Sequence, residues 1–423
     1  MFSYHSSSSP ALPYGKHLYR ALFLVPLLLS FIMKTEAVTS DILLGRIIKS
    51  LMLFSYLLLI LTIFLTDRHT LIRLKIDQWL ILAYMICCLF SEIVIHHTVT
   101  VRSIGFSIEL PVIYLGITMF FRSVYKDAER DSMWVLNITL ALLFIHIIIG
   151  FIMSNTLLVG HVSNLGDLRS VAVKGLFDGT NKFGFVCMAA GMIASSLFLK
   201  HLYDGKPSIS LIYALVAVVS LYSIFRSISR GSLFGFGIYC IVMLILLLSK
   251  PHLRDLLDRK VIYTGMALFA LIAGILTFSG ILHSFIEKFK FGSTLRFSFW
   301  MTFLGDYVSR FPGIDTIFGS GFDAHSINPY PKHVTLHSMY LEHLGRSGLV
   351  GFLLIGSILW IQIKKLLSLP ALWYLVGIPA GYLAHAVFEA KIIVGNTNTA
   401  ALFFLIILAL PHMFWDRDAK APS

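Results

Sequence analysis

Short segments that place arginine beside glycine or serine between apolar runs are the features of this sequence best suited to chemistry. In Arg226-Ser-Ile-Ser-Arg230-Gly231, a very short turn separates two apolar runs, and Arg230 begins the second. The free N–H groups of a helix N-terminus and a guanidinium fork together make a favourable anion site. Arg230 is therefore a candidate phosphate ligand, and the alternative is an interfacial arginine that reaches toward lipid headgroups.

Two further basic segments have a similar character. Arg169 and Lys174 precede a glycine-bearing turn, Gly175-Leu-Phe-Asp-Gly-Thr-Asn181, which enters an apolar run and could cradle a phosphate. Asn181 is the expected N-cap of the helix that follows. Arg296, at the end of Gly-Ser-Thr-Leu-Arg, lies on a segment expected to form an interfacial helix, so its alternative role is a headgroup contact.

Histidine and glutamate supply the candidate acid–base groups. His337 stands in Leu-His-Ser-Met-Tyr before a helical stretch, and a histidine suits proton transfer near neutral pH; the alternative is a structural residue at a helix start. His385 and Glu389 lie one turn apart, where they could hydrogen-bond to each other or contact an acceptor. The sequence has no phosphate-binding loop, zinc-protease or paired-aspartate motif, so it predicts neither a metal ion nor a cofactor.

The elements that position these residues must lie in a membrane. Of the 423 residues, 57% are hydrophobic and only 13% are charged, about half the charged share of a typical soluble domain. The mean hydropathy is +0.82. The net charge of +12 fits basic cytoplasmic loops that face anionic lipids better than it fits nucleic-acid binding. The four cysteines lie inside apolar stretches without metal-ligand spacing, so no disulfide framework or zinc site is expected.

Apolar runs predict an all-α, polytopic bundle that forms a single integral membrane domain over residues 1–423, with about twelve spans. The run from Ala21 is the first span, because no small-residue cleavage site follows it. Arg46 and Lys49 weaken the second span, and Glu109 weakens the fourth. The expected spans cover residues 18–33, 48–66, 79–97, 104–121, 132–153, 181–200, 208–225, 231–248, 261–283, 347–363, 370–388 and 397–415.

Short basic connections alternate with other connections along the chain. We expect the basic set in the cytoplasm, together with both termini, because lysine and arginine favour cytoplasmic loops. The external face then receives two long connections, residues 154–180 and 284–346, and long loops in a compact bundle usually carry function. Aromatic and basic residues over 285–307 predict an amphipathic helix at the interface. The sequence has no internal repeat, which argues against a transporter.

Four segments of the sequence together resemble the O-antigen ligase and O-antigen polymerase superfamily. Each motif is short, and the resemblance covers roughly residues 165–400. In this chain Leu336 precedes the histidine, where many relatives have proline or another small or polar residue. The matching segments are the Ser229-Arg230-Gly231 turn, the stretch from Gly292 to Arg296, the turn from Gly175 to Asn181, and Gly319-Ser-Gly321-Phe322 followed by His337 and then Gly345, Gly348 and Gly351.

The resemblance implies a metal-independent, inverting glycosyl transfer on a GT-C-like helical scaffold, with a lipid diphosphate as the leaving group. His337 would act as general base on the acceptor hydroxyl. Glu389 is similar to an acidic position of some relatives, and with His385 it is the candidate acceptor-side contact. The residues implied to bind the diphosphate are Arg230 and Arg296, with Arg169 or Lys174 as a further contact.

The resemblance also implies a place in the bacterial inner membrane, with the active site on the periplasmic face. The donor would be an undecaprenyl-diphosphate-linked glycan, and the acceptor a glycan in a polymerase or lipid A–core in a ligase. We favour the polymerase, because nothing in the external loops suggests a dedicated lipid A site. Membrane lipids, a flippase and a chain-length regulator are the expected partners. The alternative of another class, a flippase or transporter of lipid-linked glycan, would need ionisable residues at mid-helix.

Overall fold

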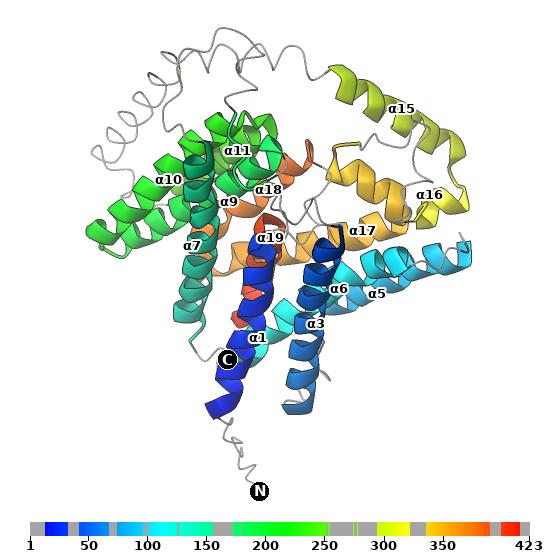
Figure 1. Cartoon of the computed structure of the whole chain (residues 1–423), viewed down its shortest axis with the longest axis horizontal. Helices are drawn as coiled ribbons and strands as arrows, with labels where there is room; N and C mark the ends of the chain where they lie inside the picture. The colour runs from blue at the N-terminus through cyan, green and yellow to red at the C-terminus, as the bar shows by residue number, and fades with distance from the viewer. Residues whose placement is uncertain are drawn as a thin grey trace, which may run out of the picture.

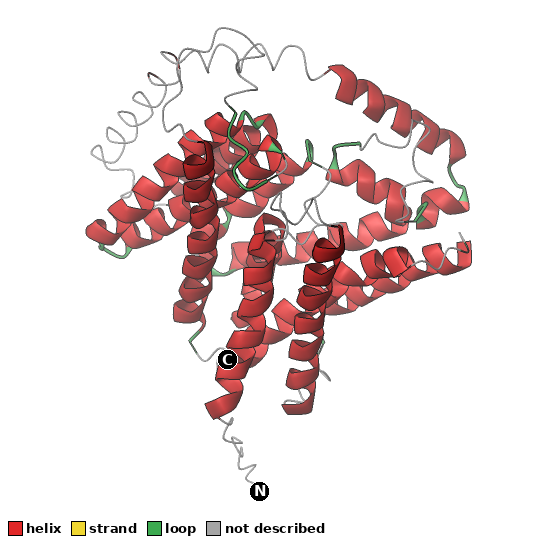
Figure 2. Cartoon of the chain, viewed as in Figure 1, coloured by secondary structure: helices red, strands yellow, loops and turns green. Residues whose placement is uncertain are grey.

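The computed structural model describes residues 13–32, 42–66, 74–95, 97, 101–124, 127–154, 172–177, 179–250, 253, 274, 277, 294–321, 336–389 and 399–414. The regular elements within these ranges are helices, drawn red in Figure 2, and the loops described between them are drawn green. The predicted all-α class is confirmed for this part of the chain. Helices from the two ends of the chain lie together, because α1 (Pro13–Ile32) contacts α19 (Thr399–Ala409) (Figure 1).

Eight helices among the described residues are long and apolar enough to cross a bilayer. Shorter apolar stretches within α1 and at α19 add to them. The chain therefore has the helices of a multi-pass membrane protein. The eight are α3 (Ile42–Thr66), α5 (Ile76–Phe90) with the π-helical turn η1 (Ser91–Ile95), α6 (Val101–Val124), α7 (Ala128–Ser154), α9 (Thr180–Tyr203), α10 (Pro207–Ser227), α11 (Arg230–Ser249) and α17 (Met339–Ser368).

Most spans predicted from the sequence coincide with these helices. The expected span over 261–283 lies almost wholly outside the described residues, so the total of twelve stays a prediction. The expected span over 370–388 is not one continuous helix, because a 3-10 helix, η3 (Pro370–Leu375), precedes the short α18 (Gly377–Ala386). Pro379 lies in the first turn of α18, where a missing N–H leaves no helical hydrogen bond unmade.

The two spans with the weakest sequence signals stabilise each other. α3 packs against α6, and across that contact Lys49 Nζ lies 2.5 Å from Glu109 Oε2. Glu109 is only 4% exposed, so its carboxylate faces neither water nor lipid. Charged residues inside membrane helices are tolerated when they pair within the bundle. This ion pair explains why both runs contain charge and still form helices.

The glycine stretch after His337 forms a close crossing of two helices. α17 begins at Met339, well before the expected start near residue 347, and its helical geometry is interrupted at Gly348, where φ is +65°. The short α16 (Ile314–Phe318) ends at Gly319 against this point. A side chain on Gly348 would come within 2.3 Å of the Gly319 nitrogen. Glycine is therefore needed at 348, both for the positive φ and for the close approach.

A buried polar network joins the last helical segment to the bundle. Tyr114 Oη donates a hydrogen bond to Asp77 Oδ2 at 2.7 Å, and His412 Nε2 lies 2.8 Å from the same oxygen. Lys365 Nζ donates to the other carboxylate oxygen at 3.3 Å. Asp77 is fully buried, and its partners come from α6, α17 and the 3-10 turn after α19. The network therefore holds together elements that are far apart in the sequence.

One helix lies at the edge of the bundle. α15 (Thr294–Arg310) is not among the helices apolar enough to span a bilayer, and Figure 1 shows it along the outer edge near α16. It belongs to the predicted external connection over 284–346, which also contains α16 and the start of α17. The helix predicted over 285–307 is thus present from residue 294, whereas 285–293 lie outside the described residues.

Basic residues follow α9 and α11 at the end opposite to the N-termini of these helices. α9 runs from Thr180 to the region of Lys200, and α11 runs from Arg230 to Lys250. The N-termini of α9 and α11 lie together at one end with the end of α18, because residues of all three line one pocket. Alternate connections therefore lie at the same end of this part of the bundle, as the sequence predicts. The assignment of either end to the cytoplasm stays a prediction.

Candidate functional site

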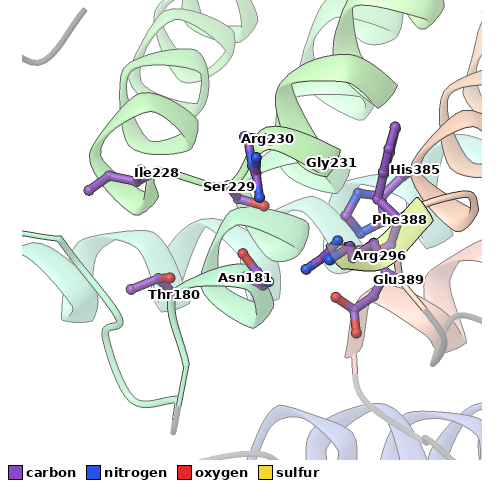
Figure 3. Close-up of a pocket in the computed structure, with 10 residues that line it drawn as sticks. All are labelled: Thr180, Asn181, Ile228, Ser229, Arg230, Gly231, Arg296, His385, Phe388 and Glu389. Carbon is purple, nitrogen blue, oxygen red and sulfur yellow. Dashed lines mark hydrogen bonds between the residues drawn. The ribbon is translucent and has the colours of Figure 1, made fainter. Parts of the chain in front are cut away.

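A polar pocket with a cavity of about 210 Å³ lies where α9 and α11 begin and α18 ends (Figure 3). We call it the arginine pocket, because two guanidinium groups line it. Four of the candidate site residues, Arg230, Arg296, His385 and Glu389, meet in this pocket. Its lining residues are Thr180, Asn181, Ile228, Ser229, Arg230, Gly231, Arg296, His385, Phe388 and Glu389.

The turn between α10 and α11 directs a helix N-terminus at the pocket. Ile228 adopts a left-handed conformation with φ +56°, which reverses the chain, and Ser229 is the N-cap residue of α11. The Ser229 hydroxyl lies 2.8 Å from the Ser232 hydroxyl. The first N–H groups of α11 have no acceptor within the helix and carry its positive dipole end, which favours an anion beside Arg230.

The start of α9 forms the second helix N-terminus of the pocket. Gly179, in an extended conformation, is the N-cap residue of this helix, so the expectation that Asn181 would be the cap is wrong. Asn181 instead lies in the first turn, where its side chain lines the pocket. α9 and the α10–α11 turn approach very closely at Gly184, where a Cβ atom would lie 2.4 Å from Ser229 Cβ. The two helix N-termini can therefore share one cavity.

Arg296 enters the pocket from α15 rather than from a spanning helix. Its Nη1 donates a hydrogen bond to the carbonyl oxygen of Phe388 at 3.0 Å, which fixes one edge of the guanidinium. Burial lowers the pKa of Arg296, while the nearby Glu389 carboxylate raises it. Because an arginine ordinarily titrates far above neutral pH, the group stays charged. Figure 3 shows Arg230, Arg296 and Glu389 around the same space.

His385 forms part of the wall of the pocket. The side chain is 1% exposed and stacks on Phe185, with the ring centroids 4.7 Å apart and the planes at 10°. It packs against Gly231, the residue that follows Arg230 at the start of α11. A buried, stacked imidazole has little freedom to follow a moving ligand. The role of His385 as an acceptor-side contact, like that of Glu389, stays a prediction.

His337 is not among the residues that line the arginine pocket. It is partly buried, directly before α17, and adopts a left-handed conformation with φ +50°. Its neighbour Leu336 accepts a hydrogen bond from the indole Nε1 of Trp300 at 2.7 Å. Trp300 lies one helical turn after Arg296 on α15, so this contact connects the histidine segment to the rim of the pocket.

The basic turn before α9 is only partly described. Arg169 lies outside the described residues. Lys174 is exposed and is not among the lining residues, so the structure does not bring it to the pocket. The turn itself packs beside the α10–α11 turn, because the Val173 N–H donates to the Arg226 carbonyl at 2.9 Å.

Several pocket residues carry too little signal in the sequence to be found there. Thr180 and Phe388 are common residue types at ordinary spacing, and only the fold brings them together. Arg226 is a different case, because the sequence marks it as the first arginine of the short turn. It is 1% exposed, and its Nη1 donates to Tyr222 Oη at 3.3 Å, so it stabilises the end of α10 rather than lining the pocket.

The composition of the pocket favours an anion with several oxygen atoms. Two guanidinium groups and two helix N-termini supply positive potential and many N–H donors, while Glu389 is the only acidic residue among the lining residues. No group of three His, Cys, Asp or Glu side chains suited to hold a metal ion occurs among the described residues. Comparison with protein-family models and with curated proteins finds no match to this chain.

Proposed function

We propose that this protein is a membrane glycosyltransferase that transfers glycan from an undecaprenyl-diphosphate carrier to a glycan acceptor, in the manner of the O-antigen polymerases. The observation that supports this most is the arginine pocket, in which Arg230 and Arg296 meet at two helix N-termini. A diphosphate carries several anionic oxygens, and these can accept hydrogen bonds from both guanidinium forks. The proposal that the diphosphate carries a glycan on an undecaprenyl chain comes from the resemblance of the four sequence motifs to the superfamily.

In the proposed reaction, the acceptor hydroxyl attacks the anomeric carbon of the donor sugar. His337 takes the proton from that hydroxyl, and the bond between the anomeric carbon and the phosphate oxygen breaks. The bonding electron pair leaves with the diphosphate, where negative charge grows. Arg230 and Arg296 stabilise this charge, which is the role that a metal ion has in many sugar transferases. Attack from the face opposite the leaving group inverts the anomeric configuration.

A helical bundle suits this donor. The diphosphate of a polyprenyl carrier lies at the depth of the lipid headgroups, and the arginine pocket lies at the ends of α9 and α11 rather than at their middle. We place this end on the periplasmic side of the bacterial inner membrane, with both termini in the cytoplasm, because the basic connections lie at the opposite end.

The test uses purified protein in lipid nanodiscs with an undecaprenyl-diphosphate-linked oligosaccharide. Wild-type protein should release undecaprenyl diphosphate and lengthen the glycan, while Arg230→Ala, Arg296→Ala and His337→Ala should each lower kcat/KM at least about a hundredfold. Arg310→Ala is the matched control, because Arg310 lies on α15 but pairs with Asp306 outside the pocket. If Arg230→Ala, Arg296→Ala and His337→Ala all transfer glycan at the wild-type rate, the assignment of these site residues is refuted.

A deletion strain separates the polymerase from the ligase. Loss of the polymerase should leave single repeat units on the lipid core, whereas loss of a ligase should leave bare core and accumulate polymer on the lipid carrier.

Proteoliposomes test the transporter class. Movement of intact donor across the bilayer without release of diphosphate would contradict a transferase.

A further inference from the structure

One face of α15 docks on the bundle through residues at helical spacing. Arg296, Trp300, Phe303 and Tyr307 follow one another at intervals of four, three and four residues, which places them on one stripe of the helix. Phe303 is 3% exposed, and the Tyr307 hydroxyl donates to the Thr316 carbonyl. The stripe therefore binds α15 to the rest of the protein at several points along its length.

Trp300 makes the contact of this stripe with the segment that precedes α17. Its indole Nε1 donates to the carbonyl oxygen of Leu336 at 2.7 Å. The N–H of Leu336 donates in turn to Glu342 Oε1 at 3.0 Å, and Arg346 Nε holds the other oxygen of that carboxylate at 2.8 Å. Leu336 is 6% exposed. Side chains from two helices thus hold its backbone from both sides.

The residue that follows this held backbone is His337. Its φ of +50° is uncommon for residues other than glycine and is favoured when neighbouring groups hold the backbone. Two hydrogen bonds to the backbone of Leu336 are described above. The one from Trp300 is made to its carbonyl oxygen, which belongs to the peptide group that joins Leu336 to His337. Loss of the indole N–H would remove this restraint from that peptide group, and the histidine could then relax more easily to a more common conformation.

Trp300 also contacts the rim of the arginine pocket. Its ring lies 6.3 Å from the ring of Phe388, measured between centroids. Phe388 lines the pocket and accepts the hydrogen bond from Arg296 through its carbonyl oxygen. The same side chain therefore contacts the pocket wall on one side and the peptide before His337 on the other.

We propose that Trp300 is a positioning residue that fixes the backbone of His337 relative to the arginine pocket. This inference rests on the proposed function, in which His337 is the base and the pocket binds the leaving diphosphate. Trp300 would touch neither substrate nor reacting atoms. Its indole N–H would set where the imidazole can meet the acceptor hydroxyl, while its ring would stay against Phe388.

The test removes the N–H and keeps the ring. Trp300→Phe keeps an aromatic ring beside Phe388, and benzothienylalanine at position 300, in which sulfur replaces the N–H, keeps the full bicyclic shape. Tyr307→Phe is the matched control, because it removes one hydrogen bond of the same stripe at the far end of α15. Both changes at position 300 should lower kcat about tenfold, with donor KM and the Kd for inorganic pyrophosphate unchanged.

Hydrogen exchange provides a readout that does not depend on activity. Amides of residues 336–342 should exchange about tenfold faster in both position-300 variants, while those of Tyr307→Phe stay at the wild-type rate. Unchanged exchange in this segment would overturn the positioning role, as would an equal loss of kcat in Tyr307→Phe. Absence of transfer by the wild-type protein would refute the proposed function, and the exchange measurement would still decide whether Trp300 holds the segment.

Discussion

Replacement of Arg296 measures how much one guanidinium contributes to anion binding in the arginine pocket. The side chain lines the pocket and donates to the Phe388 carbonyl at 3.0 Å, so its remaining N–H groups can face a ligand. A hydrogen bond to a charged group contributes about 1.5–3 kcal/mol. Loss of one such interaction in Arg296→Ala should therefore weaken binding of inorganic pyrophosphate by about 10- to 150-fold.

Lysine at the same position separates charge from geometry. Arg296→Lys keeps the positive charge but removes the planar fork, and a lysine ammonium that still donates to Phe388 has fewer N–H groups left for the ligand. We expect its loss of affinity to be about 5- to 30-fold, between wild type and the alanine variant. Arg310→Ala and Arg310→Lys are the controls on the same helix, and both should bind pyrophosphate within about twofold of wild type.

The measurement is isothermal calorimetry on protein in nanodiscs, with inorganic pyrophosphate and, separately, inorganic phosphate as titrants. Pyrophosphate should bind more tightly than phosphate, because it can reach both Arg230 and Arg296. We also expect the affinity for pyrophosphate to fall modestly at high salt, since the pocket is partly open to solvent. The reasoning fails if Arg296→Ala keeps wild-type affinity, or if the Arg310 variants lose as much as the Arg296 variants.

Three further changes test the scaffold. Asp77→Asn should lower the free energy of unfolding by about 3 kcal/mol, which is measured as a lower melting temperature in detergent. The affinity for pyrophosphate should stay the same. An unchanged melting temperature would contradict a stabilising network. Glu109→Gln should lower the melting temperature because it leaves Lys49 without its carboxylate, and Lys49→Met in the same protein should restore part of the loss. Gly184→Val should reduce both stability and pyrophosphate binding by crowding the pocket turn, whereas Gly237→Ala, which meets no atom within 4 Å, should reduce neither.

The spans were predictable because lipid imposes a simple rule on sequence. A helix that crosses a bilayer needs about 20 apolar residues, and the eight spanning helices of the described residues satisfy this almost without exception. Lys49 and Glu109 weaken the signal of two runs, but both runs form the predicted helices because the two charges pair in the fold. The differences from prediction lie elsewhere. Gly348 hides a break inside an apparently continuous helix.

The candidate site was predictable only for residues with strong individual signals. Arg230 and Arg296 stood out because arginine is rare in apolar surroundings, and both line the pocket. Asn181 was given a capping role because asparagine favours N-caps, but the extended Gly179 has that position and Asn181 faces the cavity. Sequence spacing could not show that Phe388 contacts both Arg296 and Trp300, since this depends on how α15 docks.

The docking of α15 reconciles two interpretations of Arg296 that look exclusive in the sequence. A segment rich in aromatic and basic residues predicts a helix at the membrane interface, and an arginine there would contact headgroups. The helix has two faces, however. Phe297 and Met301 are more than half exposed, whereas Arg296 and Trp300 contact the bundle. α15 can therefore rest on lipid with one face and complete the arginine pocket with the other. Because Arg296 belongs to this helix, any movement of α15 away from the bundle would remove one of the two guanidinium groups from the pocket.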